Sequence, residues 1–266
     1  SSQIAESDCF VDTNVIDQMA PPNDLLNLES FLAVEDSMDL DDFHPALLES
    51  IRSQGDLYGL PLQAQARVIF YNTTLFDEAG IDYPRSDWTL EDFLVLAIAL
   101  TEKDQQDIQY GFLPINGDIS DLRVFLFLQG ASTTDLNGLP NLDSLQMRNA
   151  LQWYADLALE NGVSPLFPVL NDPGAYQERS LLVQKGSVAM WSDFVGIDRN
   201  STWPEETTVG IAPLPTGVIR GTEFLTDGLF IATDTPHAEE CWAWIKFLAQ
   251  QPELIQVMPA SFTVLN

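Results

Sequence analysis

The sequence predicts an α/β protein in which strands and helices alternate along the chain, and two observations lead to this prediction. Short apolar runs, such as residues 68–71 and 188–191, have the length and composition of buried strands. Between such runs lie segments whose apolar side chains recur at helical spacing, bounded by capping residues and glycines. Because strands that alternate with helices usually build α/β architectures, we expect largely parallel sheets.

The first elements are short. Residues 7–12 fit a strand that ends in a polar turn, and residues 40–51 fit a helix. Residues 55–62 fit a hairpin-like pair of strands, because the Gly and Pro in this segment rule out a helix. The strand at residues 68–71 is apolar on both faces, as a covered sheet requires, and it leads through an Asn into a helix that Gly80 closes.

The helices that follow have recognisable ends. Thr89 is the expected N-cap of one helix, with Asp92 three residues later as in a capping box. A long helix is expected to begin after Asp143 or Ser144 and to stop at Gly162. Further helices are expected over residues 122–128 and from residue 236 onward, with Pro at the first position of the latter, and further strands over residues 110–117, 188–191, 209–215 and 229–233.

The composition is that of a folded and strongly acidic protein. Apolar residues make up 45% of the chain, and 11 Lys and Arg face 40 Asp and Glu, for a net charge of −29. Such a surface repels phosphate backbones and anionic lipid heads, so nucleic-acid binding is excluded.

Cysteines and histidines are too few to suggest a metal or a cofactor. Cys9 and Cys241 lie in apolar settings and are expected to be buried thiols. His44 and His237 are far apart in the sequence, so neither a zinc site nor a catalytic histidine relay is expected. No apolar run approaches the roughly 20 residues of a membrane span.

The order of the elements resembles a known family. Residues 55–84 (GDLYGLPLQAQARVIFYNTTLFDEAGIDYP), followed by residues 88–101 (WTLEDFLVLAIALT), resemble the maltose-binding-protein-like solute-binding proteins of ABC importers. Four later landmarks fall in the family's order: GDISDLRVFLFLQGA, GSVAMWSDF, VGIAPLPTG and TDGLFIATDTPHAEECWAWIKFLAQQPE. The resemblance covers the chain from Asp8 to about Ala260.

The resemblance implies a two-lobed, type II periplasmic-binding-protein-like fold that closes on a solute. Lobe one would comprise residues 1–62 and 213–266, and lobe two residues 66–211. Extended crossings near residues 61–66 and 212–215 would act as hinges. Family members also have a strand–helix–strand unit before this region and helices after it, so lobe one is expected to be incomplete and the chain trimmed at both ends.

A sugar site combines a stacking aromatic side chain with planar hydrogen-bonding groups, because sugars have apolar faces and a rim of hydroxyls. In open α/β sheets such groups lie beyond the carboxyl ends of strands. This rule and the family's cleft segments select the following ligand-binding residues: Asp12, Thr13, Gln63, Gln65, Asp118, Ser120, Arg123, Trp191, Ser192, Asp193, Thr226, Asp227 and Gly228.

Several of these residues have a structural alternative. Trp191 is either a sugar platform or a core indole, and Arg123 either reaches the ligand or pairs with a nearby acid. Asp12 and Asp193 could cap turns, and Asp227 with Gly228 could form a turn. Arg67, just past the first crossing, either clamps an acid at the lobe junction or is exposed.

The predicted function is non-catalytic binding of a carbohydrate or related small solute for delivery to the permease subunits of an ABC importer. A monomer outside the cytoplasm is expected, extracellular or periplasmic, and anchored as a lipoprotein in its full-length form. One alternative is a ligand-sensing module of a larger signalling protein. Another is a glycan-processing enzyme that uses two carboxylates such as Asp12 and Asp193.

Overall fold

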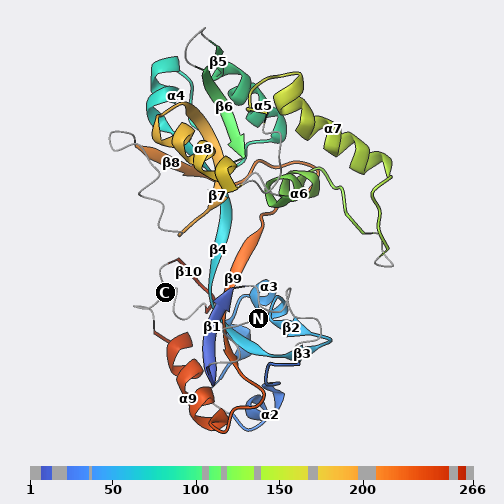
Figure 1. Cartoon of the computed structure of the whole chain (residues 1–266), viewed down its shortest axis with the longest axis vertical. Helices are drawn as coiled ribbons and strands as arrows, with labels where there is room; N and C mark the ends of the chain where they lie inside the picture. The colour runs from blue at the N-terminus through green and yellow to red at the C-terminus, as the bar shows by residue number, and fades with distance from the viewer. Residues whose placement is uncertain are drawn as a thin grey trace. The chain divides into compact units, whose positions relative to one another are not determined.

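The computed structural model divides into two compact units (Figure 1). It describes residues 7–13, 23–35, 38–103, 108–114, 119–134, 139–166, 173–196, 208–251 and 257–261. Unit 1 consists of Ser1–Ala66 and Phe224–Asn266, and unit 2 of Arg67–Glu223. Unit 1 is therefore assembled from both ends of the sequence, whereas unit 2 is one continuous segment.

Unit 1 is built on an antiparallel sheet. Its strand β9 (Phe224–Ile231) lies between β1 (Cys9–Thr13) and β4 (Gly59–Asn72), and β10 (Met258–Pro259) also pairs with β4. The other elements of this unit are α2 (Glu29–Leu32), the 3-10 helix η1 (Leu40–Asp42), α3 (Pro45–Glu49), the hairpin of β2 (Arg52–Ser53) and β3 (Asp56–Leu57), and α9 (Ala238–Ala249).

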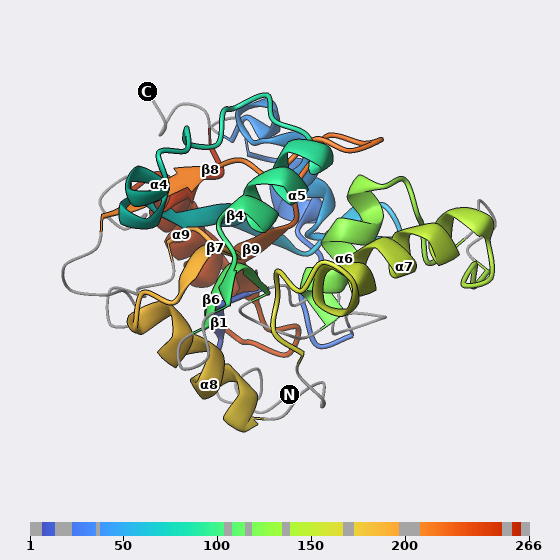
Figure 2. The ribbon, with the colours of Figure 1, turned by 90° about the horizontal axis from the view of Figure 1, so that it is seen from above.

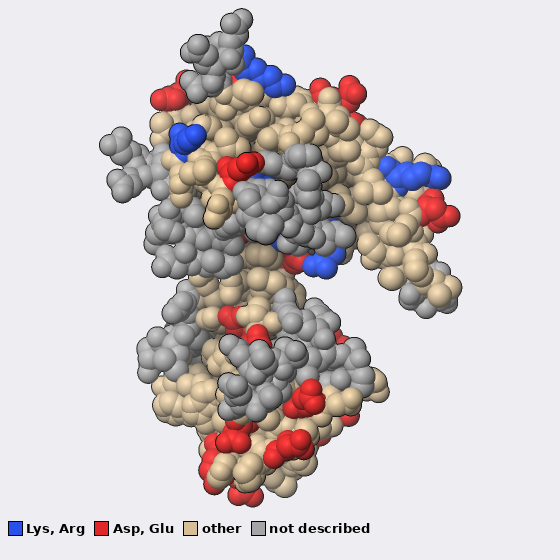
Figure 3. Space-filling view, viewed as in Figure 1, with Lys and Arg blue, Asp and Glu red and all other residues tan. Residues whose placement is uncertain are grey.

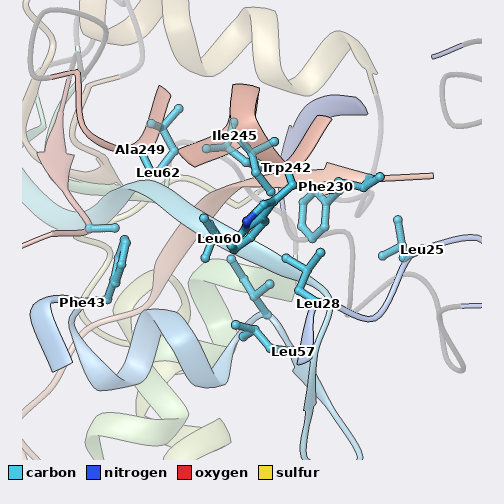
Figure 4. Close-up of a cluster of buried hydrophobic side chains, with 14 of the residues drawn as sticks. Leu25, Leu28, Phe43, Leu57, Leu60, Leu62, Phe230, Trp242, Ile245 and Ala249 are labelled. Atoms are coloured by element: carbon cyan, nitrogen blue, oxygen red, sulfur yellow. The ribbon is translucent and has the colours of Figure 1, made fainter. Parts of the chain in front are cut away.

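The core of unit 1 surrounds the first half of β4. Figure 4 shows Leu60 of β4 among Leu57, Phe230 and side chains of α9 such as Ile245. All four of these side chains are at most 1% exposed. Burial of a side chain of this size contributes about 1.5–3 kcal/mol, so this cluster is a main source of the unit's stability.

Unit 2 is built on a mixed sheet. Its strand order is β4, β7 (Val188–Phe194), β6 (Ile108–Pro114) and β5 (Glu102–Lys103), and β8 (Val209–Ala212) pairs with β4. The helices of this unit are α4 (Thr73–Ala79), α5 (Leu90–Ala99), α6 (Ile119–Leu128), α7 (Leu145–Leu159) and α8 (Pro173–Gln184).

Helices cover both faces of the sheet in unit 2, as Figure 2 shows for α5 on one side and α8 on the other. On the α5 side, Ile69, Phe93, Phe112 and Phe125 belong to one buried cluster. The α8 side has its own cluster, which includes Trp191 of β7. The sheet is thus the middle layer of three.

The long strand β4 changes its partners where the two units meet in the sequence. Its residues 59–66 pair with β9, and the last of these pairs is Ala66 with Phe224. From Arg67 onward the strand pairs with β7, and from Ile69 also with β8. The same strand therefore contributes to the core of each unit.

The α/β class is confirmed, but the expectation of largely parallel sheets is wrong. Among the described strands, β6 and β7 form the one parallel pair, and the other seven pairs are antiparallel. Alternation of strands and helices shows that helices intervene between strands. It does not determine which strands become neighbours, because that depends on long-range pairing.

The return of the chain to unit 1 lies further along than predicted. Residues 212–215 belong to unit 2, where Ala212 pairs with Ile69 and the Trp88 Nε1 donates to the Pro213 carbonyl at 2.9 Å. Leu214 is buried in the core of the same unit. The chain passes back from unit 2 to unit 1 between Glu223 and Phe224. It passes from unit 1 to unit 2 between Ala66 and Arg67, next to the predicted first crossing.

The two cysteines form a disulfide, so the expectation of buried free thiols is wrong. Cys9 of β1 and Cys241 of α9 are bonded, with a distance of 5.6 Å between their Cα atoms. Their separation of 232 positions carries no spacing signal. The pairing arises because α9 packs against the strand that pairs with β1.

Most predicted helix ends agree with the structure. The capping box of Thr89 and Asp92 is present, and Ser144 caps α7. Two helices differ. Pro45 is the first residue of α3, so the predicted helix over residues 40–51 is split into η1 and α3. The last helix, α9, begins at Ala238, with His237 rather than a residue before Pro236 as its N-cap.

Candidate functional site

The predicted residues of unit 1 include a group that converges on the carboxylate of Asp227. This carboxylate accepts hydrogen bonds from Thr13 Oγ1 at 2.5 Å and from Gln63 Nε2 at 2.7 Å. A third, longer contact from Gln65 Nε2 measures 3.4 Å. Asp227 is 7% exposed, and these three donors are all neutral groups.

Strand register explains this convergence. In β9, Asp227 lies opposite Thr13 of β1 on one side and opposite Gln63 of β4 on the other. Gln63 and Gln65 are two positions apart, so their side chains leave the same face of the sheet. The predicted residues thus lie within the strands, whereas the sequence placed Thr13 after β1 and Asp227 before β9.

The other predicted residues of unit 1 lie on the opposite face of this sheet by strand alternation. There the Thr226 Oγ1 is 3.0 Å from the Ser50 Oγ. A Cβ added to Gly228 would lie 2.6 Å from the Phe230 ring and 3.1 Å from Ile51, so this glycine is required by packing. Asp12 lies opposite Gly228 and accepts a hydrogen bond from the backbone of the next residue.

The predicted residues of unit 2 include two that share carboxylates with Arg67. The Asp121 Oδ1 accepts from Arg67 Nη1 at 2.8 Å and also from Ser192 Oγ. The Glu223 carboxylate accepts from Arg67 Nε at 2.9 Å through Oε2 and from Arg123 Nη2 through Oε1. We call Arg67, Asp121, Ser192, Glu223 and Arg123 the Arg67 cluster.

The Arg67 cluster is mostly buried. The side chains of Arg67 and Asp121 are fully buried, that of Glu223 is 17% exposed, and that of Arg123 is 60% exposed. Two cations and two carboxylates balance in charge, as burial requires, because an unpaired buried charge is strongly destabilising. The guanidinium carbon of Arg67 also lies 4.3 Å from the centre of the Phe194 ring, in a cation–π contact.

Trp191 and Asp193 lie in the interior of unit 2. Trp191 is 2% exposed and stacks on Phe70, with 5.9 Å between the ring centres. Asp193 is fully buried, and its Oδ1 accepts a hydrogen bond from the Phe194 backbone at 2.8 Å. These contacts favour the core-indole interpretation of Trp191 and a structural role for Asp193.

Two predicted residues cannot be placed in this way. Asp118 lies outside the described residues. Ser120 falls in the first turn of α6, but its side chain belongs to the part that is not described. The structure therefore brings together only part of the predicted set. In unit 1 it joins Thr13, Gln63, Gln65 and Asp227, which we call the Asp227 group. In unit 2 it places Arg123 and Ser192 in the Arg67 cluster.

Sequence reasoning missed the carboxylates that organise unit 2. Asp121 is one of several acids close to Arg123 in the sequence, and no pattern singles out Glu223. Glu223 is 156 positions from Arg67, and it lies outside the helices and strands in a segment without a motif. The interpretation of Arg67 as a clamp for an acid agrees with these contacts.

The described residues offer neither a metal site nor a membrane-spanning helix. They contain no group of three or more His, Cys, Asp or Glu that could hold a metal ion. They also contain no helix with the length and apolarity needed to cross a bilayer.

The family model for bacterial extracellular solute-binding proteins matches residues 3–253. The chain therefore belongs to the family of bacterial extracellular solute-binding proteins, and it has the α/β fold of two-lobed periplasmic-binding proteins.

Individual relatives are distant. A binding protein of Brucella abortus is 27% identical over 226 residues, which cover 79% of this chain and 52% of that protein. A mannitol-binding protein of Pseudomonas aeruginosa is 27% identical over 162 residues, which cover 58% of this chain and 35% of that protein. The chain thus spans about half the length, or less, of these curated relatives.

A solved structure matches along the whole chain. It is an ABC substrate-binding protein from Listeria monocytogenes in complex with cycloalternan, with a TM-score of 0.81 and 19% sequence identity. The match covers 100% of this chain and 70% of that one. At this identity the likeness establishes the fold.

Proposed function

We propose that this chain binds a neutral, hydroxyl-rich solute, either a carbohydrate or a polyol, without chemical turnover. The observation that carries the proposal is the Asp227 group. Its carboxylate is held in one orientation by neutral donors, two of which are at normal hydrogen-bond distance. Carboxylate and amide groups held in this way are suited to accept and donate hydrogen bonds to hydroxyls.

The charge of unit 1 argues against an anionic ligand. Of the 11 Lys and Arg residues, this unit carries two, Arg52 and Lys246. Both are paired, Arg52 with Glu29 at 3.4 Å and Lys246 with Glu35. The face drawn in Figure 3 accordingly shows Asp and Glu, but no Lys or Arg, over the described part of unit 1. An anion would meet repulsion here.

The relatives support the same class of ligand. The Pseudomonas relative is named for mannitol, a polyol, and the Listeria structure holds cycloalternan. We propose further that the chain, as a monomer outside the cytoplasm, delivers its ligand to the permease subunits of an ABC importer, anchored as a lipoprotein in its full-length form. A hinge at the first expected crossing, near residues 61–66, is part of this proposal.

Ligand-dependent thermal stabilisation tests the proposal. D-mannitol, ribitol, maltose and D-tagatose are titrated, with D-glucuronate, L-arginine and spermidine as charged comparisons. A ligand that binds only the folded form stabilises it by about 2.7 kcal/mol at 100 times its Kd, so a neutral probe should raise Tm as its concentration rises. No shift with any neutral probe, or shifts with charged probes alone, would overturn the proposed ligand class. Release of a new product during incubation would overturn the non-catalytic role.

A pair of matched variants tests the site. Thr13→Val removes the hydroxyl that donates to Asp227. Thr235→Val removes a similar hydroxyl, which donates to Asp8 Oδ1 at 2.7 Å elsewhere in unit 1. We expect binding to weaken by about tenfold in the first variant, as for loss of a hydrogen bond to a charged group, and to stay unchanged in the second. Equal binding by both variants would remove the Asp227 group from the site.

A further inference from the structure

We propose that Arg67 is a positioning residue that holds Arg123 of unit 2 ready for the ligand without touching the ligand itself. The inference rests on the proposed function, together with the expectation from the sequence that Arg123 contacts the ligand. The inference adds Arg67, which is not among the predicted ligand-binding residues. It also says how Arg67 acts, namely through the carboxylates of Asp121 and Glu223.

The first step is the reach of the Arg67 side chain. Its guanidinium binds two acids on different segments, Asp121 in α6 and Glu223 at the end of unit 2. Arginine can do this because its N–H groups form a rigid planar fork, whereas lysine presents a single compact charge. One buried side chain therefore orients two carboxylates at once.

The second step is that each carboxylate is shared between Arg67 and another side chain. Asp121 uses the same Oδ1 atom for Arg67 Nη1 and for Ser192 Oγ. Glu223 uses Oε2 for Arg67 and Oε1 for Arg123. Arg123 and Ser192 thus each share an acid with Arg67. A shift of the Glu223 carboxylate would therefore move Arg123, and a shift of the Asp121 carboxylate would move Ser192.

The third step is the difference in exposure. Arg67 is fully buried, so its guanidinium is enclosed by the protein, whereas the Arg123 side chain is 60% exposed. A long exposed side chain loses much rotamer freedom when it is ordered, and this loss opposes binding. Because Arg67 already fixes the Glu223 carboxylate, the Arg123 side chain that binds this carboxylate is partly ordered before any ligand binds.

Arg67 is itself held by the backbone around it. Its N–H donates to the Glu223 carbonyl at 2.9 Å, and its own carbonyl accepts from Thr222 Oγ1 at 2.5 Å. The ring of Phe194, which is the partner of Arg67 in the β4–β7 ladder, lies against the guanidinium. These contacts give the side chain a rigid base.

Arginine NMR in the ligand-free protein is the first test. The variant is Arg67→Lys, and the matched control is Arg85→Lys, which alters an exposed ion pair with Asp87 in the same unit. We expect the Arg123 Nη signals to show slow rotation in the unaltered protein and fast rotation in Arg67→Lys, with no change in Arg85→Lys. Slow rotation that persists in Arg67→Lys would overturn the proposal. If Arg67→Lys does not fold, Glu223→Gln loosens the same contact and is judged by the same signals.

Binding gives the second test. Calorimetric titrations with D-mannitol and with maltose are carried out on Arg67→Lys, Arg123→Gln and the double variant. Positioning through Arg123 predicts that each single change weakens binding by about tenfold and that the double change is no weaker than the worse single one. Losses that multiply would indicate independent effects and overturn the proposal. If the unaltered protein binds neither probe while the NMR change is seen, the proposed ligand class fails and the coupling of Arg67 to Arg123 stands.

Discussion

Cys9 and Cys241 join the strand β1 to the helix α9 by a disulfide that spans 232 positions of sequence. In the described sheet, β1 is an edge strand with β9 as its neighbour. A covalent bond at its first residue adds an anchor that hydrogen bonding on one side alone does not provide. Disulfides persist in oxidising surroundings, which agrees with an extracellular family.

Reduction of this disulfide should destabilise unit 1. Loss of a native disulfide typically costs about 2–5 kcal/mol, and long closed loops lie toward the upper end. The chain has two cysteines, so dithiothreitol can act on this bond alone. We expect urea unfolding to shift to lower concentration in its presence, and a Cys9→Ser/Cys241→Ser variant to unfold equally with or without it. An unchanged midpoint for the reduced protein would contradict an anchoring role.

The capping box at the start of α5 should give the protein a measurable acid sensitivity. Hydrogen bonds from the Thr89 backbone, and then from its hydroxyl, hold the pKa of Asp92 below its ordinary value of 3.8. A carboxyl group whose pKa is lower in the folded state contributes stability above its unfolded pKa and loses it as pH falls through the folded pKa. We therefore expect this contribution to be constant from neutral pH to about pH 4 and to decline below it.

Two variants at Thr89 separate the cap from other acid effects. Thr89→Ala should lower the free energy of unfolding by about 1 kcal/mol at neutral pH and flatten its decline in acid. Thr89→Ser keeps the hydroxyl and should resemble the unaltered protein. Equal behaviour of the two variants in urea titrations at pH 7 and pH 3 would refute the assignment.

Gly111 should tolerate no side chain, because β6 passes very close to α5 at this point. A Cβ on Gly111 would lie 1.8 Å from the Ala97 carbonyl oxygen, and backbone atoms cannot yield as a flexible side chain can. We expect Gly111→Ala to cost about 3 kcal/mol or more in unfolding free energy. In the matched Gly221→Ala variant the nearest atom is a Phe127 ring carbon at 3.1 Å, and the cost should stay within about 1 kcal/mol. Similar stabilities would argue against this close approach.

Trp191 should contribute mainly to stability. Because its indole is buried against Phe70, Trp191→Ala should cost about 3–5 kcal/mol in urea unfolding. Trp244 of α9 is 38% exposed, and its replacement by Ala should cost clearly less. A Trp191→Ala variant that keeps its stability but loses sugar binding would restore the platform interpretation.

Local features were predictable because the residues that cause them are close in sequence. Thr89 and Asp92 are three positions apart, and Gly80 closes α4 in the left-handed region, with φ of 65°, that glycine adopts at no steric cost. The strand-end rule also selected Thr13, Gln63, Gln65 and Asp227, although it could not separate them from neighbours on the opposite face.

What the sequence did not reveal depends on contacts between distant segments. The Cys9–Cys241 bond, the antiparallel pairing of β4 with β7, β8 and β9, and the link between Arg67 and Glu223 all arise from packing across more than a hundred positions. No composition or spacing in the neighbourhood of these residues encodes their partners, so only the folded chain shows them.

The split construction of unit 1 has a consequence for biogenesis. A chain emerging from a ribosome or a translocation pore delivers Arg67–Glu223 as one uninterrupted block, so all parts of unit 2 are present once Glu223 has emerged. The part of unit 1 that precedes Arg67, by contrast, cannot complete its core until Phe224 and the residues after it have been synthesised. Until then Leu60 and other apolar side chains of this part lack their partners. Chaperones that shield nascent apolar surface would accordingly be needed longer by the part of unit 1 that precedes Arg67 than by unit 2.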